Sequence, residues 1–337
     1  MIKYPQLLQN ATIGVTAPSS GVEESLHHLL FSAKERFKRE GHVLVTGDTA
    51  WAQDKAKSAP ARERAAEFTS MMHNPEIDMI LPPWGGELLI EILEHLDFDT
   101  LPAKWVMGYS DTSLLLFAMT LKTGMATAHG VNLVDLRGEY SDQTTAMWKQ
   151  VLMTKQGESV EQRSSEKYQN EWDHVNPTPC VYNLTEPTKW KTASGEGLSM
   201  EGRLLGGCID IIRNVVGTPF ANVPTFQKTF LHDEPILWYF ENYAMKSTDM
   251  RRALVQMKLA GWFDNTSGIL FGRSPANLPV ENYTIEDVYK ELTEELQIQI
   301  VYDVDCGHVP PQVTLINGAH AVVQVADGKG TVVQTFK

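Results

Sequence analysis

The stretch Gly108-Tyr109-Ser110-Asp111 has residue types suited to nucleophilic catalysis. It lies between the apolar runs 105–107 and 114–119, which predict a buried strand followed by a core helix. A serine at such a corner presents its hydroxyl outside the sheet, beside helix N–H groups that favour negative charge. The pattern therefore predicts Ser110 as the nucleophile of an acyl-transfer reaction. Ser110 or Asp111 could instead simply cap the helix, since both residue types are preferred there.

A serine nucleophile needs a base that accepts its proton, and histidine most often has this role. The chain has 10 histidines, so position must select among them. His308 follows an apolar run and lies in the segment 305–311, directly after a glycine and shortly before two prolines. This pattern predicts a rigid loop that aims the ring, although a histidine that only packs there fits the local sequence as well.

The base in turn needs an acid that holds its tautomer and stabilises its charge. Glu241 follows the apolar run 237–240, which predicts a carboxylate at the end of a buried strand. A buried carboxylate must be paired or hydrogen-bonded, so Glu241 is expected to accept from His308 or from backbone N–H groups. Three other acids compete for the role at this point: Asp111, Asp303 and Asp305.

The oxyanion formed by serine attack needs N–H donors aimed at it. Gly85 and Gly86 follow another predicted strand, so the backbone there can approach a substrate closely. We predict the N–H groups of Gly86 and Asp111 as the donors, although two glycines also suit a tight turn. The sequence has neither a phosphate-binding glycine loop nor a Cys-x-x-Cys pair, so we expect no cofactor and no metal.

Strand and helix patterns alternate along the first 130 residues. The predicted strands cover 12–17, 42–45, 78–81 and 105–107, with 126–130 following, and the predicted helices cover 23–40, 60–73, 87–96 and the run after Ser110. Strands joined by crossover helices predict an α/β fold with a mostly parallel sheet flanked by helices. Ligands bind at the carboxyl ends of such strands, where both the glycine pair and Ser110 are expected.

The chain changes character near residue 155. Residues 155–198 are polar with little periodicity, which predicts a linker or lid after an N-terminal α/β domain at 1–154. Residues 199–337 predict a second, smaller α+β domain that carries Glu241 and His308. Its expected elements are strands at 237–240, 268–272, 300–304 and 312–316, helices at 247–260 and 284–296, and a closing hairpin of 322–325 with 331–333.

Length and composition fit two domains and no nucleic-acid partner. The chain has 337 residues, of which 42% are hydrophobic and 21% charged, as in ordinary globular proteins. Its formal net charge of −13 lacks the cationic excess that phosphate binding requires. Three scattered cysteines predict free thiols in a reducing compartment. We recognise no signal peptide or transmembrane stretch, so we expect a cytoplasmic protein that does not bind membranes.

Six motifs follow one another along nearly the whole chain. They are 15–20, Trp84-Gly85-Gly86, Gly108-Tyr109-Ser110-Asp111, 201–207, Phe240-Glu241-Asn242 and Gly307-His308. Together they resemble the LD-carboxypeptidase and microcin-C immunity family of serine peptidases. The resemblance implies that Ser110, Glu241 and His308 form a catalytic triad between an α/β domain and a smaller C-terminal domain. It also implies a homodimer.

Departures from the family pattern bear on the substrate. Many LD-carboxypeptidases have Arg-Gly-Gly-Tyr where this chain has Trp84-Gly85-Gly86-Glu87, and Asn242 replaces a frequent aspartate. The polar segment with Trp190 resembles the microcin-immunity branch, in which a loop tryptophan stacks on the nucleotide part of the substrate. Trp190 could instead be a hydrophobic anchor for the linker, which is the role we favour.

The resemblance leaves two substrate classes open. They are a murein peptide with an L-to-D junction and a microcin-like aminoacyl nucleotide. The alternative to an enzyme is a non-catalytic ligand-binding protein on the same scaffold. A glutamine-amidotransferase-like enzyme is disfavoured, because its nucleophile is a cysteine and none of the three cysteines lies at a strand-to-helix corner.

Overall fold

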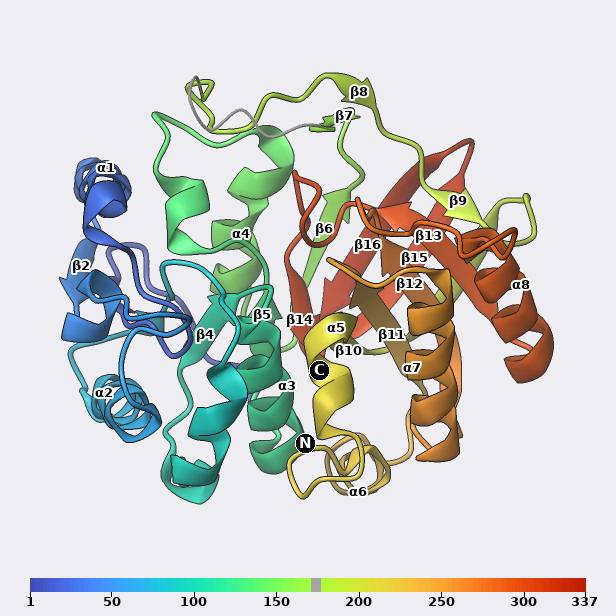
Figure 1. Cartoon of the computed structure of the whole chain (residues 1–337), viewed down its shortest axis with the longest axis horizontal. Helices are drawn as coiled ribbons and strands as arrows, with labels where there is room; N and C mark the ends of the chain where they lie inside the picture. Colours follow the sequence, from blue (N-terminus) through green and yellow to red (C-terminus); the bar gives the residue numbers. More distant parts are fainter. Residues whose placement is uncertain (171–176) are drawn as a thin grey trace.

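Two β-sheets lie side by side in the computed structural model, which describes residues 1–170 and 177–337 (Figure 1). The first sheet has six strands in the order β14-β5-β4-β3-β1-β2. All neighbours are parallel except β14, which pairs antiparallel with β5. The predicted α/β class with a mostly parallel N-terminal sheet is therefore confirmed. The strands are β1 (Thr12–Val15), β2 (Val43–Thr46), β3 (Met79–Ile80), β4 (Trp105–Gly108), β5 (Thr127–His129) and β14 (Leu315–Asn317).

The second sheet has eight strands in the order β6-β16-β15-β10-β11-β12-β13-β9. Its centre, from β10 to β13, is parallel, so the carboxyl ends of these strands share one edge. Antiparallel strands flank this centre on both sides. The strands are β6 (Ser159–Arg163), β9 (Lys191–Thr192), β10 (Leu198–Cys208), β11 (Ile236–Glu241), β12 (Thr266–Gly272), β13 (Gln299–Val304), β15 (His320–Ala326) and β16 (Lys329–Thr335).

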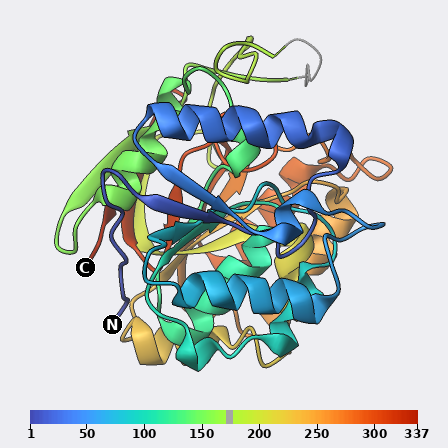
Figure 2. The same ribbon diagram turned by 90° about the vertical axis from the view of Figure 1, so that its left-hand side faces the viewer.

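Helices cover the sheets and join them. Figure 2 shows α1 and α2 on opposite faces of the first sheet. The apolar helix α3 packs against β5 of the first sheet and β10 of the second. Its Phe117 ring lies 5.3 Å from the Trp262 ring, centroid to centroid. The two sheets therefore share one core across α3. The helices are α1 (His27–Arg39), α2 (Ala61–His73), α3 (Thr112–Thr123), α4 (Gln143–Met153), α5 (Ile209–Ile212), α6 (Val223–Phe230), α7 (Ser247–Leu259) and α8 (Ile285–Leu296).

Some segments differ from the sequence-based expectation. The predicted helix at 87–96 is a 3-10 helix, Leu89–His95. The strand expected at 312–316 is β14, which completes the first sheet, because its ladder partner is β5. Within the expected linker 155–198, β6 and β9 pair with opposite sides of the second sheet, and β7 (Lys167–Tyr168) pairs with β8 (Glu186–Pro187). Residues 171–176 of this segment lie outside the described residues.

A membrane span is not found among the helices that the structure describes, since none of them is long and apolar enough.

Candidate active site

Ser110 lies at a sharp corner between β4 and α3. Its φ of +60° falls in the left-handed region, which a serine rarely adopts. Gly85 lies directly against it, because a Cβ on Gly85 would come within 2.6 Å of the Ser110 Cβ. A strained serine on a strand-to-helix corner, with a side-chain-free backbone beside it, has the form of a nucleophile elbow.

Capping does not account for the Asp111 side chain. Asp111 occupies the N-cap position of α3, but its carboxylate makes no capping hydrogen bond. Instead, its Oδ2 accepts from the Leu89 N–H at 2.8 Å and from the Ser19 hydroxyl. Burial works to raise the pKa of Asp111, although these two hydrogen bonds oppose it. The carboxylate thus ties together the loops after β1 and β3 at the base of the elbow.

Glu241 and His308 meet at the carboxyl edge of the second sheet. Glu241 is the last residue of β11 and is 1% exposed. Its Oε2 lies 2.7 Å from His308 Nδ1. Gly307 makes this approach possible, since it has a φ of +93° and a Cβ there would lie 2.5 Å from the Glu241 Cβ. The structure therefore contains the Glu241–His308 pair. The sequence alone had left Glu241 in competition with three other acids.

Each member of this pair shifts the titration of the other. Burial works to raise the pKa of Glu241, but the charge of His308 and the hydrogen bond to it outweigh burial and hold that pKa below its usual value. Burial works to lower the pKa of His308, whereas the charge of Glu241 and the same hydrogen bond raise that pKa above its usual value. The carboxylate therefore stabilises a protonated imidazole.

The elbow and the pair open into one cavity of about 460 Å³. Ser110 and His308 both line it, together with Gly85 and Gly86. The structure records no hydrogen bond between the Ser110 hydroxyl and His308. Such contacts often shorten only when a substrate is bound. The cavity thus brings Ser110 and His308 to the same space from the first and second sheets.

Two predicted donors lie beside the elbow. Neither the Gly86 N–H nor the Asp111 N–H has a hydrogen-bond acceptor within residues 1–170 and 177–337. Gly86 has a φ of +147°, and a Cβ there would lie 2.7 Å from the Ser20 backbone nitrogen. Both N–H groups are therefore free to donate to a substrate oxygen.

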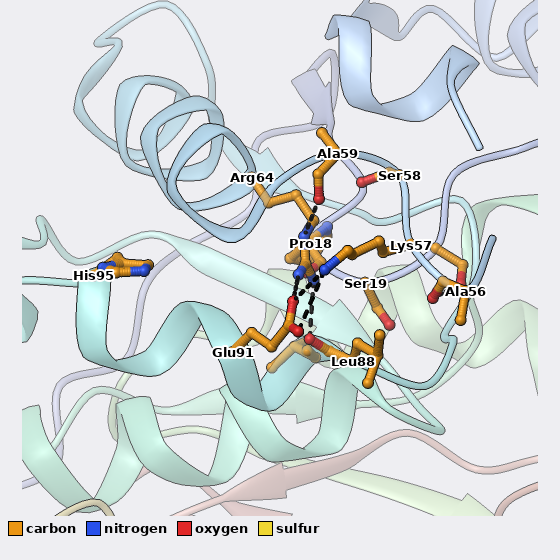
Figure 3. A network of polar contacts seen from close by, with 12 residues as sticks. Pro18, Ser19, Ala56, Lys57, Ser58, Ala59, Arg64, Leu88, Glu91 and His95 are labelled. Atoms are coloured by element: carbon orange, nitrogen blue, oxygen red, sulfur yellow. Dashed lines mark hydrogen bonds and ion pairs between the residues drawn. The ribbon is translucent and has the colours of Figure 1, made fainter. Parts of the chain in front are cut away.

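A buried arginine, Arg64, connects the loop after β1 with the segment after the glycine pair (Figure 3). The Arg64 guanidinium donates to the carbonyls of Pro18 and Leu88, at 2.8 and 3.0 Å, and lies 2.5 Å from a Glu91 carboxylate oxygen. It also donates to the Ala59 carbonyl. Arg64 therefore joins the loop after β1 to the segment that follows Gly85–Gly86. Sequence analysis missed this residue, because an arginine on an amphipathic helix carries no sign of its partners.

Two tyrosines that sequence analysis did not select contact the His308 ring. The ring centroids of Tyr109 and Tyr243 lie 5.1 and 4.5 Å from that of His308. Tyr109 belongs to the serine corner, and Tyr243 follows Glu241 by two residues. Both tyrosines lie next to predicted site residues in the sequence, and this proximity could have identified them. The tyrosines limit how far the imidazole can rotate.

One group of metal-ligating side chains occurs among the residues that the structure describes. Ligand atoms of Cys208, Glu241 and His308 lie within 4.8 Å of one another. Sequence spacing could not show this group, since its members come from three separate strand ends. Within this group, Glu241 is hydrogen-bonded to His308.

The remaining acids have partners elsewhere. Asp305 pairs with Arg273 and accepts from the Ser165 N–H at 2.8 Å. Asp303 pairs with Lys191 at 2.7 Å. Neither carboxylate contacts His308, so of the candidate acids only Glu241 does.

Trp190 does not lie at the cavity. It is 2% exposed, packs in the apolar cluster beneath the second sheet, and donates its indole N–H to Asp305 at 2.9 Å. The expectation of substrate contact at Trp190 is corrected accordingly. A buried indole with a satisfied N–H fits the other role considered for Trp190, an anchor for the polar segment.

Comparison with known proteins places the chain in a peptidase family. Residues 13–130 match the LD-carboxypeptidase N-terminal domain, and residues 201–323 match the LD-carboxypeptidase C-terminal domain. The chain is 26% identical over 322 residues to the microcin C7 self-immunity protein MccF of Escherichia coli, covering 93% of this chain and 90% of that protein. It is 24% identical over 333 residues to a probable murein peptide carboxypeptidase of Bacillus subtilis, covering 96% and 92%.

A solved structure gives the same picture of the fold. The structure of MccF in complex with aspartyl sulfamoyl adenosine superposes with a TM-score of 0.82 at 24% identity, covering 99% of this chain and 98% of that one.

Proposed function

We propose, from the premise that the chain belongs to the LD-carboxypeptidase family of serine peptidases, that Ser110, His308 and Glu241 are its catalytic triad. The observation that carries the proposal is the Glu241–His308 hydrogen bond at the cavity that Ser110 also lines. The chain order Ser, Glu, His differs from that of chymotrypsin-like enzymes, but a triad is defined by geometry and roles.

Each residue has a step in the proposed amide hydrolysis. With Nδ1 hydrogen-bonded to Glu241, the Nε2 atom of His308 is the one available to Ser110. Nε2 accepts the hydroxyl proton as Ser110 Oγ attacks the carbonyl carbon, and the N–H groups of Gly86 and Asp111 stabilise the oxyanion. Protonated His308 then gives that proton to the leaving amine. Water, deprotonated by His308, releases the acyl group from Ser110.

Two substrate classes fit this chemistry. One is a murein peptide that ends in a free carboxylate, as the name of the Bacillus subtilis relative suggests. The other is an aminoacyl nucleotide, in line with the aspartyl sulfamoyl adenosine bound in the solved relative.

The test compares both substrate classes with matched variants. The purified protein is incubated with a murein tetrapeptide and with aminoacyl sulfamoyl adenosines, and released products are quantified by mass spectrometry. Ser110→Ala is expected to lower kcat by roughly 10⁴-fold or more. Ser113→Ala is the control, because Ser113 is a buried serine on α3 that does not line the cavity. Equal hydrolysis by the Ser110→Ala variant would remove Ser110 from the mechanism.

A non-catalytic protein is the competing function. Binding of a substrate by calorimetry with no hydrolysis by the unsubstituted chain would support it. Covalent labelling of Ser110 by a serine-directed reagent would argue against it, since an unactivated serine does not react at such rates.

The proposal includes a homodimer in the cytoplasm. The dimer follows from the resemblance to the family. The cytoplasm is supported by the free thiols of Cys180, Cys208 and Cys306, which suit a reducing compartment. Light scattering after size-exclusion chromatography tests the dimer, and cell fractionation tests the compartment.

A further inference from the structure

The walls of the Ser110 cavity carry a one-sided charge. Glu23, Glu87 and Asp210 line it, and none of its described lining residues is a lysine or an arginine. Among the described lining residues, His308 is the only one whose side chain can become positive. A cavity whose charged groups share one sign attracts ligands of the opposite charge and repels ligands of the same charge.

The three acids lie on segments that follow strands of both sheets. Glu87 directly follows Gly86, one of the proposed oxyanion donors, and Glu23 lies in the loop before α1. Asp210 comes from α5, after β10 of the second sheet. A ligand at Ser110 therefore has carboxylates both on the glycine-loop side and on the side of Glu241 and His308.

These carboxylates are not neutralised by basic side chains. None of the three forms an ion pair with any residue that the structure describes. Glu23 accepts a hydrogen bond from the Ser25 hydroxyl at 2.7 Å. Asp210 accepts from the N–H groups of Tyr243 and Ala244, both at 2.9 Å. Such neutral donors leave the full negative charge in place, so the cavity retains it.

Apolar side chains occupy other parts of the same walls. Leu26, Trp84 and Ile211 line the cavity with the ring of Tyr243. The indole N–H of Trp84 already donates to the Gly21 carbonyl at 3.0 Å, so the ring presents carbon atoms to a ligand. The cavity thus offers apolar surface for the body of a substrate and negative charge for its substituents.

We propose that this cavity selects substrates that carry an ammonium or other cationic group close to the scissile amide, and disfavours acidic ones. The proposal rests on the proposed function, since it assumes that the scissile amide lies at Ser110. The expected substrate differs in charge from the ligand of the solved relative, whose amino-acid part is aspartyl. In an aminoacyl substrate, the matching residue would be basic.

Three sulfonyl fluorides of one size test the charge preference without knowledge of the substrate. They are benzenesulfonyl fluorides that carry an aminoethyl group, an ethyl group or a carboxyethyl group in the para position. In each, Ser110 Oγ attacks sulfur, fluoride leaves, and the hydroxyl proton passes to His308. Mass spectrometry of the labelled Ser110 peptide gives second-order rate constants, each divided by the rate of the same reagent with a small serine-hydroxyl mimic in buffer.

The cationic reagent is expected to label Ser110 about tenfold or more faster than the anionic one, with the neutral reagent between them. Each exposed charge contact contributes modestly, but three contacts change sign together between the two reagents. The ratio should fall in 0.5 M salt because ions screen exposed charges. Equal rates, or faster labelling by the anionic reagent, would overturn the charge preference. No labelling of Ser110 by any reagent would overturn the proposed function instead.

Charge-neutralising variants locate the effect. Glu23→Gln combined with Glu87→Gln should lower the cationic-to-anionic ratio severalfold. Glu24→Gln is the matched control, because Glu24 is an exposed neighbour of Glu23 that does not line the cavity. The same ratio in all three proteins would show that these carboxylates do not set the preference. Lysyl and glutamyl sulfamoyl adenosine then extend the test to hydrolysis, with kcat/KM expected to be higher for the lysyl compound.

Discussion

The His308 Nδ1 atom lies 2.7 Å from the Glu241 Oε2 atom. This contact joins the last residue of β11 to the loop after β13. Because Glu241 is 1% exposed, its charge acts on His308 with little screening by water. The contact fixes the imidazole orientation and decides the pH at which the ring can accept a proton.

The pH dependence of hydrolysis should reflect this pair. In the proposed mechanism, His308 accepts the Ser110 proton only when neutral, so kcat/KM should fall as the pH decreases through the pKa of His308. Since Glu241 raises that pKa, the acid limb should lie above the value of about 6.5 that is usual for histidine. In Glu241→Gln the raising charge is lost while burial, which lowers the pKa, persists. The acid limb should therefore move to lower pH as kcat falls. A pH–rate profile of both proteins measures this, and an unmoved limb would contradict the assignment.

The sequence was informative where a candidate catalytic residue lies at the end of a local apolar pattern. Ser110, Glu241 and His308 each follow an apolar strand, so single segments revealed them. Their convergence required the family resemblance, since 67 residues separate Glu241 from His308. Arg64 was not predictable, because its carbonyl partners lie in other segments. The strand that became β14 was predicted, but its short apolar run gives no indication that it pairs with β5 of the first sheet.

Gly307 should be needed for the Glu241–His308 contact. Gly307→Ala places a methyl group within 2.5 Å of the Glu241 Cβ and forces alanine into a φ of +93°. We expect a loss of about 2–4 kcal/mol in the free energy of unfolding and a kcat lower by roughly 10²-fold, as for other small misplacements of catalytic groups.

Gly157→Ala is the control for backbone strain alone. Gly157 has a φ of +89°, and nothing lies within 4 Å of a Cβ there. This variant should lose roughly 1 kcal/mol of stability and no activity. Denaturant unfolding and steady-state kinetics of both variants give the comparison. Equal kcat in the two would show that Gly307 does not serve the catalytic pair.

Arg64 should stabilise the glycine loop as well as the protein. Arg64→Met leaves the carbonyls of Pro18, Ala59 and Leu88 without their buried donor. The expected loss is roughly 3 kcal/mol of unfolding free energy, with kcat/KM reduced about tenfold at a temperature where the variant is folded. Arg252→Met is the control, since that side chain is 71% exposed and should change stability by less than about 0.5 kcal/mol. Unchanged kcat/KM in Arg64→Met would limit Arg64 to a role in stability.

Trp190 and Trp84 should respond in opposite ways to the same substitution. Trp190→Phe removes the N–H donor to Asp305, a fully buried carboxylate, and should cost about 1.5–3 kcal/mol of stability while KM stays within twofold. Trp84 lines the Ser110 cavity, so Trp84→Phe should change KM more than it changes stability. Thermal unfolding and steady-state kinetics separate the two readouts. A raised KM in Trp190→Phe without a loss of stability would restore Trp190 as a substrate contact, because only a residue that touches the ligand can weaken binding while the protein remains as stable as before.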